Sequence, residues 1–168
     1  PSTRRFERRI GYKFIDRKLL HKALSIPHRS NRENYEVLEF LGDATLRYII
    51  PKLLIERYGK ISQGELTRMC GVIACNATLA HLAARLGLHH CINFGSKEPT
   101  HDLKLLADVL EAVIGAIDQE AGLKTAYEVC KKLFQLNVEI ARFAHPMETL
   151  LSVKGKGSKG RPVFFLYP

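Results

Sequence analysis

The sequence predicts an all-α protein, and three observations support this fold class. Apolar residues recur at helical spacing along nearly the whole chain, and no segment before the last few residues shows the two-residue alternation of a half-buried strand. With 168 residues, 46% of them hydrophobic, the chain is long enough to bury one core. Pro27, Gly59 and Gly87 stand where helices are expected to end, and they divide the chain into segments of ordinary helix length.

The expected helices follow in order. Asp16 is placed to cap a helix that carries the apolar residues from Leu19 to Leu24, and the Ile26-Pro27 step ends it. A long apolar helix is expected over residues 34–58, with a kink at Pro51. One amphipathic helix is expected over residues 62–85, a second apolar helix over 101–119 and a surface helix over 121–141. In the surface helix, the residues expected to face inward are Tyr127, Cys130, Phe134 and Val138.

We expect residues 1–144 to form one domain and residues 145–168 to form a C-terminal extension. The extension begins at a His-Pro step and holds a short helical segment at 147–153, the basic run KGKGSKGR and the strand-like PVFFLY. A lone strand has no partner in an all-α domain. The extension is therefore either the truncated start of another module or a feature peculiar to this protein.

The charge of the chain points to a polyanionic partner. The formal net charge is +9, from 26 Lys and Arg against 17 Asp and Glu. Basic residues crowd both ends, and most acidic residues lie between them. A nucleic acid or an acidic membrane surface fits this balance. No run of about 20 apolar residues is present, so we expect no membrane-spanning segment.

The four cysteines lie in apolar, periodic segments and are expected to be buried free thiols in a reducing compartment. We therefore expect an intracellular protein, in the cytoplasm, with an organelle or the nucleus left open. Several histidines accompany the cysteines, which makes a zinc site the alternative interpretation. Cys70 and Cys75 are five residues apart on an expected helix and point in different directions, and no finger-type spacing occurs.

The first apolar helix carries a row of carboxylates. Glu36, Glu39 and Asp43 occupy positions i, i+3 and i+7, so they share one helix face, while apolar residues cover nearly every other direction. Such a row is usually solvated. Here the apolar surroundings predict a largely buried helix, in which unpaired charges are costly.

The second apolar helix repeats the pattern. Asp108 and Glu111 are three residues apart on its polar side, with Lys104 on the same side. The economical arrangement is that the two acidic faces meet and share a cation. Gly42 and Gly115 fit this arrangement, because a glycine inside a buried helix permits close approach of two backbones. Oxygen-only ligands favour a hard ion, so we expect Mg²⁺, with Mn²⁺ as a substitute, and metal-assisted hydrolysis of a phosphodiester.

Four segments, in order, resemble the ribonuclease III family. Residues 35–46 (YEVLEFLGDATL) resemble its signature helix, and residues 104–117 (KLLADVLEAVIGAI) resemble its second catalytic helix. Between them, residues 64–69 (GELTRM) and 76–80 (NATLA) match two further stretches of the family. The resemblance covers about residues 6–134 and implies the fold of the family's helical endonuclease domain.

The resemblance also implies an activity: cleavage of double-stranded RNA by a homodimer that leaves 5′-phosphate and 3′-hydroxyl ends with short 3′ overhangs. It implies no small-molecule cofactor and no membrane partner. The implied catalytic and metal-binding residues are Glu39, Asp43, Asp108 and Glu111. Implied accessory residues are Glu36, Lys104, Glu65 and Asn76, and Phe40 is implied to insert into the partner subunit.

One departure from the family and one alternative function remain. Gln63 stands where bacterial members commonly carry an acid, which puts an accessory role of this position in doubt. The extension weakly resembles the opening of a double-stranded RNA-binding domain. The alternative function is a catalytically silent RNA-binding or ribosomal component with the same fold. Because all four expected ligands are present, the sequence favours the nuclease.

Overall fold

The protein is all-α, as the sequence predicts. The computed structural model describes residues 2–27, 33–95 and 102–141, with side chains as far as residue 135. Within these ranges the helices are α1 (Ser2–Ile10), α2 (Arg17–Ala23), α3 (Glu36–Tyr58), α4 (Gln63–Ile73), α5 (Asn76–Leu86), the 3-10 helix η1 (Leu88–His90) and α6 (Leu103–Ala141). The same ranges hold no named strand, only an isolated bridge between Ser25 and Asn93. The expected domain end at 144 and the extension lie outside the described residues.

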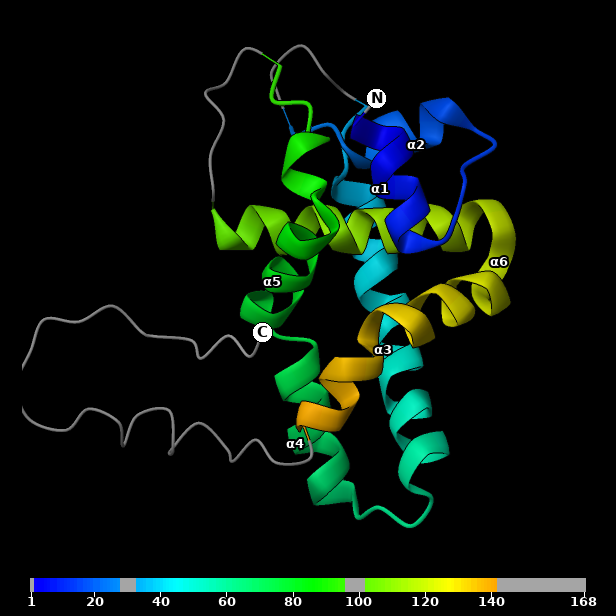
Figure 1. Cartoon of the computed structure of the whole chain (residues 1–168), viewed down its shortest axis with the longest axis vertical. Helices are drawn as coiled ribbons and strands as arrows, with labels where there is room; N and C mark the ends of the chain where they lie inside the picture. The colour runs from blue at the N-terminus through cyan, green and yellow to red at the C-terminus, as the bar shows by residue number, and fades with distance from the viewer. Residues whose placement is uncertain (1, 28–32, 96–101, 142–168) are drawn as a thin grey trace, which may run out of the picture.

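The crossing of α3 and α6 is the centre of the fold (Figure 1). The two backbones touch at Gly42 and Gly115, as the sequence predicts. A Cβ atom on Gly42 would lie 1.8 Å from the carbonyl oxygen of Glu111, and one on Gly115 would lie 2.1 Å from that of Leu38. Real atoms cannot approach so closely, so only glycine permits this contact. The crossing brings the first half of α3 against the first half of α6.

The expected single helix over residues 62–85 is wrong, because the chain forms α4 and α5 instead. Their axes differ by 47°. Ala74 ends α4, and Cys75 has an extended backbone with φ −73° and ψ 151°. Thr78 Oγ1 donates a 2.7 Å hydrogen bond to the carbonyl of Val72 across this bend. The bend contains neither proline nor glycine, and apolar residues keep their spacing through it, so the sequence carries no ordinary break signal.

The last two expected helices form one run, α6, which turns sharply at Gly122. This residue has φ 82° and ψ 165°, a conformation that favours glycine. The expected boundary near residue 120 is therefore confirmed as a kink. Cys130 and Phe134 are buried as expected and Tyr127 is half-buried, whereas the side chain of Val138 lies outside the described part. The long helix α3 continues through Pro51 and ends at Gly59, which has φ 62°.

Helix α1 is a structural element that the sequence analysis did not predict. Phe6 and Ile10, one turn apart, are buried in the core, while the arginines of α1 face outward. Glu7 is buried as well, where its Oε1 accepts from the backbone N–H of Phe14 at 2.9 Å and pairs with Arg17 at 2.5 Å. The spacing of Phe6 and Ile10 was the available signal, and the many basic residues obscured it.

The cysteines are all free, but they are not all buried. Cys130 is buried, Cys70 and Cys91 are half-buried, and Cys75 is exposed at the start of α5. The expectation of buried thiols is therefore wrong for Cys75, because the bend before α5 turns it outward. In the described ranges, no single helix has the length and apolar composition to cross a membrane, although the bent pair α4 and α5 meets both criteria together.

Glu120 ties the segment between α1 and α2 to α6. Its carboxylate accepts hydrogen bonds from the hydroxyl of Tyr12 and from the backbone N–H groups of Asp16, at 2.7 Å, and Ile15, at 3.2 Å. Asp16 in turn caps α2 as the sequence predicts, accepting from the N–H groups of Lys18 and Leu19. Partial burial alone raises the pKa of Glu120, but the three hydrogen bonds outweigh it and leave the pKa below its usual value.

We expect Glu120→Gln to destabilise the protein by about 1–2 kcal/mol at neutral pH, because a charged acceptor is lost. A lowered pKa stabilises the fold above the unfolded value of about 4.5, and this contribution disappears as the pH falls through the folded value. The difference in unfolding free energy between the two proteins should therefore shrink in acid. Urea titrations at pH 7 and pH 4 measure it. A difference that is equal at both pH values would contradict the assignment.

Candidate functional site

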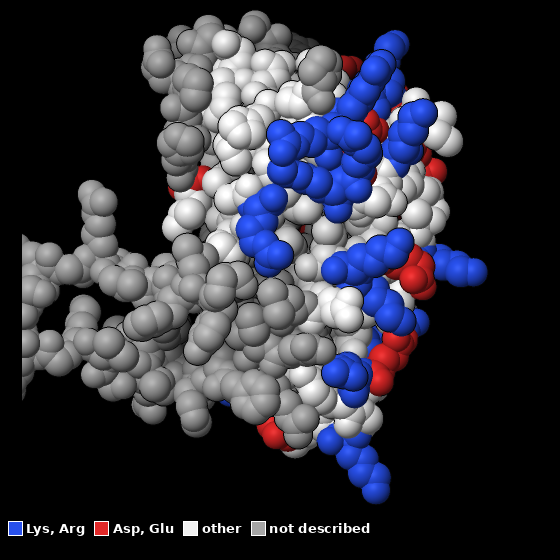
Figure 2. Space-filling model, in the orientation of Figure 1, with Lys and Arg blue, Asp and Glu red and all other residues white. Residues whose placement is uncertain are grey.

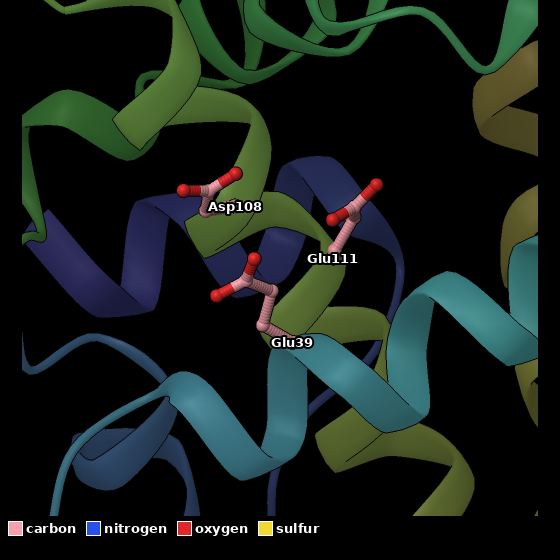
Figure 3. A group of neighbouring side chains, drawn as sticks. All are labelled: Glu39, Asp108 and Glu111. Atoms are coloured by element: carbon pink, nitrogen blue, oxygen red, sulfur yellow. The ribbon is translucent and has the colours of Figure 1, made fainter.

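Three carboxylates from two helices converge beside the α3–α6 crossing (Figure 3). Glu39 lies in the first turn of α3, and Asp108 and Glu111 lie on the first half of α6. One oxygen of each lies within 4.8 Å of the others. Asp108 is buried, and Glu39 and Glu111 are half-buried. The structure thus brings together three of the four expected ligands. Their role as ligands remains a prediction.

Burial and mutual repulsion both disfavour the charged forms of the acids in this carboxylate group. The pKa of Glu111 is raised to about 7, first by burial and then by the charges of Asp43, Asp108 and Glu39. The pKa of Glu39 is also raised, again first by burial and then by Asp108. Placing three acids together costs free energy unless a proton or a cation joins them.

Lys104 supplies one positive charge to the group. Its Nζ lies 2.5 Å from Oδ2 of Asp108, one turn along the same helix. This hydrogen bond is the main reason that the pKa of Lys104 is raised. The same charge lowers the pKa values of Glu39 and Glu111, although repulsion and burial prevail for both. Lys104 therefore balances only part of the negative charge.

Asp43 lies outside the group of three. Its two carboxylate oxygens accept from Nε of Arg47 at 2.9 and 2.8 Å, one turn further along α3. Its charge still reaches the site, because it is the largest electrostatic contribution to the raised pKa of Glu111. Arg47 is not among the site residues predicted from the sequence. An arginine four residues after an acid on a helix is the signal that was available.

Tyr35 is a second neighbour that the sequence analysis did not single out. It is buried immediately before α3, and its backbone N–H donates to the carbonyl of Ser25 at 3.0 Å. The pKa of its phenol is raised to about 12, first by burial and then by the charges of Asp108 and Glu39. The phenol therefore stays neutral and lies within electrostatic reach of the carboxylates. Its position four residues before Glu39 was the available signal.

An apolar surface lies beside the site on α3. Phe40 is 82% exposed and Val37 is 70% exposed, although they flank the buried Leu38. Large apolar side chains so fully exposed and so close together are uncommon on a monomer.

The Ribonuclease-III-like family profile matches residues 13–137 of the chain. The chain belongs to this family. It is 35% identical over 153 residues to ribonuclease 3 of Bacillus cereus, covering 85% of this chain and 62% of that protein. It is 38% identical over 138 residues to ribonuclease 3 of Francisella tularensis, covering 80% and 59%.

A solved structure of the family has the same fold. The nuclease domain of ribonuclease III from Campylobacter jejuni superposes with a TM-score of 0.74 at 31% identity, covering 79% of this chain and 96% of that one. In that Campylobacter domain, a region involved in dimer formation is structurally flexible. The chain thus matches almost all of a ribonuclease III nuclease domain but spans less than two thirds of the curated relatives.

The family-implied accessory residues occupy different places. Glu36 is exposed in the first turn of α3 and adds to the raised pKa of Glu39. Glu65 closes a capping box with Ser62 at the start of α4, where its Oε2 accepts from the Ser62 hydroxyl at 2.7 Å. Asn76 is exposed at the start of α5.

Glu65 does not join the carboxylate group within one chain. Glu65 lies in α4, which starts just after the C-terminal end of α3 (Figure 1). Glu39 lies near the N-terminal end of α3. The 23 residues of α3 span about 34 Å, so the two acids lie at opposite ends of that helix. Gln63, the departure from the bacterial pattern, lies at the same distant end. Accessory roles for Glu65 and Asn76 remain predictions.

Proposed function

We propose that this chain is the nuclease domain of a divalent-metal-dependent endoribonuclease that cleaves double-stranded RNA. The observation that carries the proposal is the carboxylate group of Glu39, Asp108 and Glu111, whose oxygens lie within 4.8 Å of one another in a ribonuclease III-like fold. An acidic group of this kind does not attract RNA by itself. A cation is needed to bring the scissile phosphate and the carboxylates together.

The donor set fits a hard divalent ion. All the donors are carboxylate oxygens, which suit Mg²⁺ and Mn²⁺ rather than zinc. Burial and, after it, mutual repulsion raise the pKa values of Glu39 and Glu111, and a cation relieves this repulsion. Asp43 is the fourth candidate ligand, once its carboxylate leaves Arg47. When bound, the ion supplies a water of lowered pKa and offsets charge on the leaving oxygen.

The protein's own groups hold the reactants in place. Lys104 holds the carboxylate of Asp108 beside the other two acids through a 2.5 Å contact between its Nζ and Oδ2. Arg47, when it releases Asp43, becomes free to bind a phosphate oxygen with its planar guanidinium. A-form RNA is recognised through phosphates and 2′-hydroxyls, so such contacts select a duplex by shape. The expected products carry 5′-phosphate and 3′-hydroxyl ends.

The cleavage test uses long duplex RNA, with duplex DNA of the same sequence as the control. We expect Mg²⁺-dependent cutting of the RNA, comparable cutting with Mn²⁺, and none with EDTA. Duplex DNA should remain intact, because it lacks the 2′-hydroxyl and the A-form shape. Binding of duplex RNA without cleavage, at any concentration of Mg²⁺ or Mn²⁺, would instead establish the alternative of a catalytically silent RNA-binding component.

We further propose that the active form is a homodimer that pairs through the apolar surface of α3. A two-fold axis matches the local symmetry of a duplex, so two sites cut the two strands at a fixed stagger. The exposure of Phe40 and Val37 supports this proposal. The dimer-forming region described for the Campylobacter domain supports it as well.

The dimer prediction compares two substitutions of exposed apolar residues. Phe40→Glu places a charge in the proposed interface and should convert the dimer to a monomer at micromolar concentration. Ile15→Glu makes the same change at an 88% exposed residue between α1 and α2 and should leave the dimer intact. Analytical ultracentrifugation measures both. If Phe40→Glu stays dimeric, or if the parent protein is monomeric, the proposed interface is wrong.

A further inference from the structure

A basic pocket lies between α1 and the end of α5, on elements that carry none of the carboxylates. Its volume is about 500 Å³, and its lining includes Arg5, Arg9, Arg85, His89 and His90. Figure 2 shows Lys and Arg side chains gathered over α1 on this side of the molecule. None of the lining residues belongs to α3 or α6. The pocket therefore differs from the site of the proposed nuclease.

The fold brings the three arginines of this pocket together. Arg5 and Arg9 are one turn apart, so they lie on one exposed face of α1, and the adjacent Phe6 also lines the pocket. Arg85 lies in the last turn of α5, just before Gly87 ends that helix in the left-handed conformation with φ 74°. A Cβ atom at Gly87 would lie 2.6 Å from a guanidinium nitrogen of Arg9. The absence of a side chain at Gly87 thus makes room for Arg9.

The arginines of the pocket have no acidic partner in the described ranges. Within residues 2–27, 33–95 and 102–135, no ion pair is formed by Arg5, Arg9 or Arg85. The carboxylate nearest in sequence, Glu7, is buried and paired with Arg17. Like charges one turn apart repel. Among the described residues, three guanidinium groups thus surround one hollow without an acidic partner, and an anion with several oxygens stabilises such a concentration of positive charge.

We propose that this pocket binds phosphate groups. Guanidinium groups donate paired hydrogen bonds in a plane that matches phosphate oxygens, which makes arginine the preferred residue for this ligand. The concave shape distinguishes the pocket from a flat basic face that only solvent contacts, and its volume accommodates a di- or triphosphate. The phosphates come either from the backbone of a nucleic acid or from a free polyphosphate such as a nucleotide carries.

The test compares two double variants of the same helix with equal loss of charge. Arg5→Gln with Arg9→Gln removes the pocket arginines of α1. Arg4→Gln with Arg8→Gln, also one turn apart, removes two exposed arginines that do not line the pocket. Glutamine has nearly the helix propensity of arginine, so both variants should fold, as circular dichroism would verify. Tripolyphosphate and duplex RNA are titrated separately with EDTA present, which excludes metal-mediated binding at the carboxylates and cleavage of the RNA.

We expect the pocket variant to bind at least one of the two ligands about tenfold more weakly than the parent, and the Arg4/Arg8 variant to lose less than about twofold. Selective loss of duplex RNA identifies the backbone as the source, and selective loss of tripolyphosphate alone identifies a free polyphosphate. Equal losses in the two variants, or no saturable binding of either ligand by the parent, overturn the proposal. Because no divalent cation is present, none of these results depends on nuclease activity.

Discussion

Replacing Glu111 with glutamine should lower cleavage of duplex RNA by at least about 100-fold while leaving RNA binding intact. The substitution keeps the shape of the side chain and removes one carboxylate from the group of three. A neutral amide is a poor ligand for a hard divalent ion, so the charge that the ion offsets in the transition state is no longer stabilised. Single-turnover cleavage in Mg²⁺ and filter binding in EDTA separate the two effects.

A matched control is available on the same helix. Glu128→Gln removes one exposed carboxylate of α6 beyond the kink at Gly122 and should cut RNA at the parent rate. Binding of RNA without metal should tighten slightly in Glu111→Gln, because a negative charge near the phosphates is gone. A folded, dimeric Glu111→Gln protein that cuts at the parent rate would remove Glu111 from the catalytic site and weaken the assignment of the whole group.

The second large effect is expected at the helix crossing. Gly42→Ala or Gly115→Ala should destabilise the protein by at least about 3 kcal/mol, because each new Cβ collides with the backbone of the other helix. A backbone carbonyl cannot rotate away as a flexible side chain can, so α3 and α6 must separate. The carboxylates then separate with them. Urea denaturation measures the loss, and Mg²⁺-dependent cleavage should fall in parallel.

Gly71→Ala is the matched control for the crossing. This glycine is also inside a helix, on the exposed side of α4, and a Cβ there meets nothing within 4 Å. Alanine should therefore stabilise the protein by about 0.5–1 kcal/mol through its better helix propensity. Gly42→Ala and Gly71→Ala should thus have opposite signs. Equal effects at the two positions would show that helix propensity, and not the close approach, determines the result.

The helices that carry the carboxylates were the most predictable part of the protein. Long apolar periodicity marks α3 and α6. Because both helices are buried, the acids at helical spacing on each of them are expected to face each other. The two helix glycines gave an independent indication that the backbones meet. Helix α1 was missed because its arginines dominate the composition, and the α4–α5 break was missed because Ala74 and Cys75 are compatible with a continuing helix. Local pattern does not encode such tertiary choices.

The site itself was only partly predictable for a different reason. Sequence spacing places Asp43 on the same helix face as Glu39, but it does not say whether the side chain turns toward α6 or along its own helix to Arg47. Similarly, the burial of Tyr35 beside the acids depends on the path of the chain before α3, which its hydrogen bond to Ser25 fixes. Both facts arise from packing between segments that are distant in sequence.

The two ion pairs at the site offset part of its negative charge while the metal-free protein folds. Asp43 and Asp108 each hold a cationic side chain from one turn away, Arg47 and Lys104 respectively. These intramolecular partners provide positive charge to the acidic group before any ion arrives, so the polypeptide can fold as the apo form. In the proposed function, binding of a divalent ion would then replace these internal cations with an external one, without building new structure. Small zinc domains, which unfold when the metal is withdrawn, behave in the opposite way. Here a chelator should abolish activity reversibly while the helices stay folded.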